Sequence, residues 1–72
     1  MKTYTINTLE NYRKWEKWFR DNGYSPWQYQ YRWDASEGFH AWFMKAGEKD
    51  IEVVTHSEEV HNAIYKFKAP GD

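Results

Sequence analysis

Residues 39–45 (FHAWFMK), 46–49 (AGEK) and 50–55 (DIEVVT) form the stretch of sequence that decides the fold. The first and third segments are rich in aromatic and β-branched side chains, which favour strands. The four residues between them include Gly47 and predict a turn. Because two strands joined by so short a connection pair antiparallel, the sequence predicts a β-hairpin over residues 39–55.

Upstream of this hairpin, residues 27–33 (WQYQYRW) carry an aromatic side chain at every second position. Alternation with a period of two places these aromatic side chains on one face of a strand and Gln28, Gln30 and Arg32 on the other. The aromatic face is either the centre of a small core or a surface that stacks on something else. With residues 34–38 as a turn-rich loop, we predict a third strand over residues 27–33 and an antiparallel meander.

Two predicted helices flank these strands. In the first, over residues 9–21, the apolar side chains that fall within one arc of a helix are Leu9, Tyr12, Trp15 and Phe19. Either Asn7 or Thr8 provides its N-cap, and Asn22-Gly23 ends it. The second helix begins after Ser57, a favourable N-cap, and ends before Pro70-Gly71. Its apolar face consists of Val60, Ala63, Ile64 and Phe67.

Together these elements predict the fold class α+β. We expect two layers, a three-stranded antiparallel meander with two helices on one face, in the order α-β-β-β-α. Residues 3–6 (TYTI) predict either an extra N-terminal edge strand or an ordered lead-in. A chain of 72 residues is short enough for residues 1–72 to form a single domain.

The composition explains how so short a chain can be stable. It has no cysteine, but it has five Trp, six Tyr and four Phe, and aromatic side chains bury much area per residue. The absence of cysteine fits a reducing compartment and excludes disulfides and thiolate metal sites. No signal-peptide segment is visible, and the longest apolar run, residues 41–44, is too short to span a membrane. We therefore expect a soluble, cytoplasmic protein without a membrane partner.

Candidate catalytic and metal-ligating residues are sparse. His56 and His61 have the spacing i, i+5, whereas a zinc-binding helix needs two histidines at i and i+4. The serines fall in predicted loops and caps, and the glycines are dispersed at turns rather than gathered in a phosphate-binding loop. We therefore expect no enzymatic activity, no metal, no cofactor and no small-molecule substrate.

The strand over residues 39–45 indicates a surface for protein binding. Its alternation points Phe39, Ala41 and Phe43 one way and the intervening side chains the other. If the first set lies in the core, the second set faces solvent or a partner. Trp, Met and Arg are enriched at protein interfaces, so the predicted protein-binding residues are Arg32, His40, Trp42 and Met44.

The resulting prediction is a small non-enzymatic protein-interaction module that binds another protein or forms a homodimer. The short, cysteine-free, aromatic-rich composition suggests, without a motif, the hypothesis of a phage or mobile-element accessory protein that binds and modulates a host factor.

Single-stranded nucleic-acid binding is the alternative. Bases would stack on the aromatic strand, beside the basic side chains of the first helix, Arg13, Lys14, Lys17 and Arg20. Two features weigh against it. The net charge is −1, and the spacing of Glu16 and Arg20 predicts ion pairs within the helix.

Overall fold

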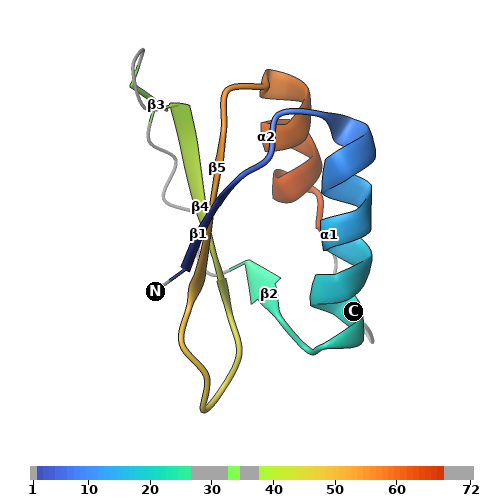
Figure 1. Ribbon diagram of the computed structural model, residues 1–72, viewed down its shortest axis with the longest axis vertical. Coiled ribbons are helices and arrows are strands. Elements are labelled where there is room, and N and C mark those ends of the chain that lie inside the picture. Colours follow the sequence, from blue (N-terminus) through green and yellow to red (C-terminus); the bar gives the residue numbers. More distant parts are fainter. Residues whose placement is uncertain (1, 27–32, 35–37, 68–72) are drawn as a thin grey trace.

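The computed structural model of the protein describes residues 2–26, 33–34 and 38–67. Its elements in chain order are β1 (Lys2–Thr5), α1 (Leu9–Asp21), β2 (Ser25–Pro26), β3 (Trp33–Asp34), β4 (Gly38–Met44), β5 (Ile51–Thr55) and α2 (Glu58–Tyr65). Figure 1 shows the sheet nearly edge-on with both helices on the same side. The predicted α+β class, with two helices on one face of a sheet, is therefore confirmed.

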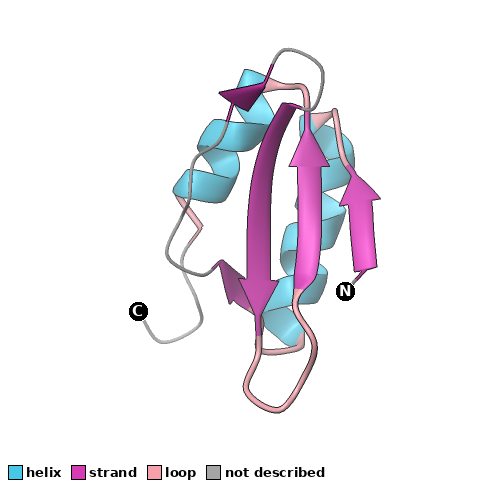
Figure 2. Ribbon diagram, turned by 90° about the vertical axis from the view of Figure 1, so that its left-hand side faces the viewer, coloured by secondary structure: helices cyan, strands magenta, loops and turns pink. Residues whose placement is uncertain are grey.

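The sheet is mixed, and its strand order is β1-β5-β4-β2, with β3 also paired to β4. β4 and β5 form the predicted antiparallel hairpin, in a register that runs from Phe39 opposite Thr55 to Phe43 opposite Ile51. β1 lies parallel to β5 (Figure 2). In the register of this pair Tyr4 is opposite Val53. The strand order therefore differs from the predicted meander, because the N-terminal strand is a full member of the sheet at its edge.

The predicted aromatic strand over residues 27–33 lies outside the described residues except for its last position. The described segments on either side of it both pair antiparallel with β4. β2 places Pro26 opposite Phe43, and β3 places Trp33 opposite Phe39. These pairings hold one edge of β4, while β5 holds the other.

Local signals fix both ends of α1. The Thr8 side chain accepts a hydrogen bond from the Asn11 backbone N–H at 3.2 Å, so Thr8 is the N-cap. At the other end Gly23 has φ +79°, a left-handed conformation that glycine adopts without strain. The Tyr24 N–H reaches the Phe19 carbonyl at 2.8 Å, which completes a Schellman-type ending. The predicted bounds of this helix are confirmed.

Asn7, the other candidate cap, has a different role. Its side-chain oxygen accepts a hydrogen bond of 2.7 Å from the His56 N–H and so joins the loop before α1 to the loop before α2. Ser57 caps α2 by accepting from the Val60 N–H at 3.2 Å, as predicted. α2 ends at Tyr65, earlier than its apolar pattern predicted.

The core lies between the helices and the sheet. Its most deeply buried side chains include Tyr12 and Phe19 of α1, Phe43 of β4, Val53 of β5 and Ile64 of α2. The rings of Phe19 and Phe43 are parallel within 5°, with centroids 3.9 Å apart. This stack joins α1 directly to the central strand of the sheet.

Candidate functional site

The two faces of β4 have opposite environments. Phe39, Ala41 and Phe43 are buried under the helices. The alternate side chains project to the opposite side of the sheet, where Trp42 is half-buried and Met44 is 36% exposed. The structure therefore places His40, Trp42 and Met44 on the side of the sheet away from the helices, whereas Arg32 lies outside the described residues.

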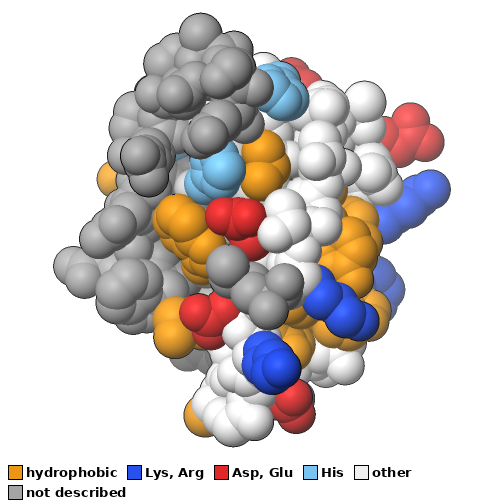
Figure 3. All heavy atoms as spheres, turned by 60° about the vertical axis from the view of Figure 1, so that its left-hand side comes forward, with side chains coloured by type: hydrophobic (Ala, Val, Ile, Leu, Met, Phe, Trp, Pro, Cys, Tyr) orange, Lys and Arg blue, Asp and Glu red, His pale blue; other side chains and the backbone are white. Residues whose placement is uncertain are grey.

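We call this side of the sheet the outer face. Strand register adds residues of β5 and β1 to it, since Val54 lies opposite His40, Glu52 lies opposite Trp42, and Thr3 lies beside Glu52. The outer face thus consists of Thr3, Thr5, His40, Trp42, Met44, Glu52 and Val54. Figure 3 shows a histidine beside an acidic side chain and hydrophobic side chains on this side of the molecule.

Glu52 organises the polar part of the outer face. The Thr3 hydroxyl donates to Glu52 Oε1 at 2.9 Å, and His40 Nδ1 lies 3.1 Å from Glu52 Oε2. The side chains of His40 and Glu52 are only 18% and 15% exposed. One carboxylate thereby connects β1, β5 and β4, and it fixes the imidazole ring 6.2 Å from the Trp42 ring.

Nothing in the sequence alone distinguishes Glu52 from the other acidic residues of the chain. The hairpin register puts Glu52 opposite Trp42, and the alternation of the two strands was a sequence signal for their shared face. The contact between Glu52 and Thr3 could not be predicted from the sequence, because it depends on the parallel pairing of β1. In chemical terms the Glu52 carboxylate orients two neighbours: it accepts a hydrogen bond from the Thr3 hydroxyl and lies within hydrogen-bond distance of the His40 imidazole.

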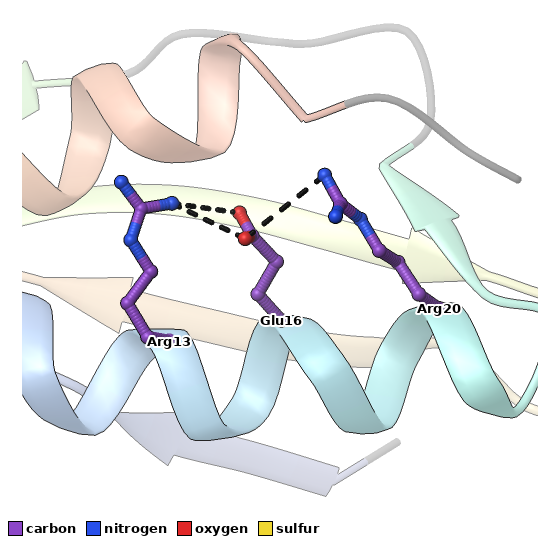
Figure 4. Close-up of polar contacts among 3 residues, drawn as sticks. All are labelled: Arg13, Glu16 and Arg20. Atoms are coloured by element: carbon purple, nitrogen blue, oxygen red, sulfur yellow. Dashed lines mark hydrogen bonds and ion pairs between the residues drawn. The ribbon is translucent and has the colours of Figure 1, made fainter.

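The predicted basic residues of α1 are largely paired within the helix. Arg13 Nη1 lies 3.2 Å from both carboxylate oxygens of Glu16, and Arg20 Nη2 lies 4.0 Å from one of them. All three side chains extend from α1 toward α2 (Figure 4). Lys17 Nζ lies 2.8 Å from an Asp21 carboxylate oxygen, and this hydrogen bond raises the pKa of Lys17.

Glu16 is buried although it is charged. It lies one turn from Tyr12, whose pKa is raised well above its usual value, first by burial and then by the nearby carboxylate of Glu16. The arginines on either side of Glu16 compensate its negative charge. Without them, burial of a carboxylate at the edge of the core would be costly. Arg13 and Arg20 thus support the packing of α1, and Lys14 lies on a different side of the helix, beside Trp15 and Trp18.

The histidines that bracket the start of α2 are separated by the fold. His61 is buried and stacks on Phe39 with ring centroids 4.2 Å apart, whereas His56 is exposed. Burial lowers the pKa of His61 from its usual value of 6.5, although Glu58 acts in the opposite direction. Over residues 2–26, 33–34 and 38–67, no group of three or more His, Asp or Glu side chains is arranged to hold a metal ion.

Comparison with models of protein families, with curated proteins and with solved structures gives no match for this chain. Neither α1 nor α2 has the length and apolar character needed to cross a membrane, within the part of the chain that the structure describes. The geometry of the outer face is therefore the main guide to function.

Proposed function

We propose that this protein is a small non-enzymatic protein-interaction module and that the outer face is its docking surface. The observation that carries the proposal is the packing of both helices on the other face of the sheet, which leaves Trp42 and Met44 outside the core. A partly exposed Trp beside a Met is the composition that protein interfaces favour.

The polar network supports this proposal by holding the surface in one conformation. Glu52 fixes both Thr3 and His40, so these side chains lose little conformational freedom when a partner binds. The matching partner is a protein that seats an apolar side chain against Trp42 and Met44. Modulation of a host factor, as accessory proteins of phages and mobile elements perform it, is the role we propose, and the cysteine-free composition supports a cytoplasmic setting.

A photo-crosslinking amino acid in place of Met44 tests the proposal in cells of the source organism. The matched control carries the same amino acid in place of Lys17, an exposed position on α1. We expect a specific protein adduct from position 44 that is absent from position 17. An adduct with twice the mass of the 8.8 kDa chain would identify a homodimer, and a heavier one would identify a partner protein. Equal labelling from both positions would refute the proposal.

The ion pairs of α1 weigh against nucleic-acid binding as the main function. Arg13, Lys17 and Arg20 each already contact a carboxylate, so a phosphate would have to compete for them. Affinity for single-stranded nucleic acid that falls steeply with salt, and that Lys17→Glu abolishes, would favour this alternative.

A further inference from the structure

A concave surface lies on the helix side of the sheet, on the opposite side from the outer face. It is an open hollow of ≈ 950 Å³ between α1, the edge strand β1 and the turn that joins β4 to β5. Tyr4 of β1, Trp15 and Trp18 of α1, and Tyr24 contribute the aromatic part of its wall. Because these residues come from three separate parts of the chain, the hollow exists only in the folded protein.

The four rings form a continuous series. The centroids of Tyr4 and Trp15 are 4.5 Å apart, those of Trp15 and Trp18 are 6.2 Å apart, and those of Trp18 and Tyr24 are 5.5 Å apart in a stacked arrangement. Tyr24 is buried, whereas Trp18 is 44% exposed. Trp18 is thus supported by a buried ring and still presents apolar surface that a flat ligand could cover.

Three lysines from different elements line the same hollow: Lys2 on β1, Lys14 on α1 and Lys49 in the β4–β5 turn. None of the three forms an ion pair with a described residue, in contrast to Lys17, which pairs with Asp21. Lys14 precedes Trp18 by four residues, so the two side chains lie on the same side of α1. Glu48 and Asp50 also line the hollow, and they set a limit on how much negative charge it can accept.

We propose that this hollow binds a small anionic ligand with a flat aromatic ring. The ring stacks on Trp18, and the phosphate or carboxylate of the ligand meets the Lys14 ammonium group, with Lys2 and Lys49 adding positive potential at the rim. A ligand with both features gains aromatic stacking and a charge-assisted hydrogen bond together. A neutral ring makes only the first of these contacts, and a bare anion makes only the second. The sequence predicted no small-molecule ligand, because the three segments that line the hollow are far apart in the chain.

Titration of nitrogen-labelled protein, followed through the indole N–H signals of its tryptophans, tests this proposal. The probes are AMP and indole-3-acetate, which combine a ring with a phosphate or a carboxylate, and adenosine and inorganic phosphate, which each have one of the two features. We expect at least one of the first pair to shift the Trp15 and Trp18 signals in a saturable manner at millimolar concentrations. Adenosine and phosphate should bind about tenfold more weakly or not at all.

Variants locate the binding site. Lys14→Glu and Trp18→Ala should each weaken binding about tenfold or more, whereas Lys17→Glu on the same helix should leave it unchanged. Lys14 is exposed, so its substitution keeps the test valid even if Trp18→Ala unfolds the protein. The absence of saturable shifts with both anionic aromatic probes would overturn the proposal, and so would equal weakening by Lys14→Glu and Lys17→Glu. Neither result would bear on the crosslinking test of the outer face.

Discussion

The stack of Phe19 on Phe43 makes a quantitative prediction for the stability of the fold. Phe19 is fully buried, and its ring also lies within 6.0 Å, centroid to centroid, of Trp15, Trp18 and Tyr24. Truncation of a buried Phe to Ala costs about 3–5 kcal/mol, which includes the cavity left behind. A domain of 72 residues has a total stability of about 4–11 kcal/mol. We therefore expect Phe19→Ala to lose a large part of the stability of the protein.

Two further variants separate the sources of this loss. Phe19→Leu keeps most of the apolar volume and removes the ring stack, so its expected cost is about 1–3 kcal/mol. Trp18→Ala, at the adjacent and partly exposed position, should cost less than Phe19→Ala because less of its surface is buried.

Urea denaturation, followed by tryptophan fluorescence and by far-ultraviolet circular dichroism, measures these differences. An unchanged slope with denaturant would show that the variants differ in stability rather than in the extent of unfolding. A cost below about 1 kcal/mol for Phe19→Ala would refute the view that this stack joins α1 to the sheet.

Three other predictions follow from single residues. Gly38 and Gly47 both have positive φ, but a Cβ on Gly38 would lie 2.6 Å from the Thr55 carbonyl oxygen, whereas one on Gly47 would meet nothing within 4 Å. The urea midpoint should therefore fall by much more for Gly38→Ala than for Gly47→Ala. Gly47→Ala carries only the backbone cost of positive φ, about 1 kcal/mol. Equal effects of the two substitutions would contradict this reasoning. Thr8→Ala removes the N-cap of α1 and should cost about 1 kcal/mol in the same assay, whereas Thr8→Ser should retain most of the stability. Because burial lowers the pKa of His61, the unfolded chain binds its proton more readily; stability should decline as pH falls below about 6.5 and level off below the folded-state pKa. Replacement by Gln should remove this part of the pH dependence, and a wild-type profile in His61→Gln would assign it to other groups.

The sequence by itself determined the elements whose signals are local. The apolar period and the Gly23 signal defined α1, Ser57 located the start of α2, and the alternation in residues 39–55 gave the hairpin and its two faces. Caps, turns and side-chain periodicity act over a few residues, so they can be recognised without knowledge of the rest of the chain.

Only the tertiary structure decided which of these local features meet. β1 pairs in parallel with a strand at the other end of the chain, and this pairing brings Thr3 to Glu52 across 49 positions. The same folding buries Glu16, whose pairing with Arg20 the helical spacing already indicated, and it assembles the lysine-rimmed aromatic hollow around Trp18. Such contacts depend on how the layers pack. A parallel strand pair has no short connecting turn that could be recognised in the sequence. A charged residue is retained in a core only when its partners are in place.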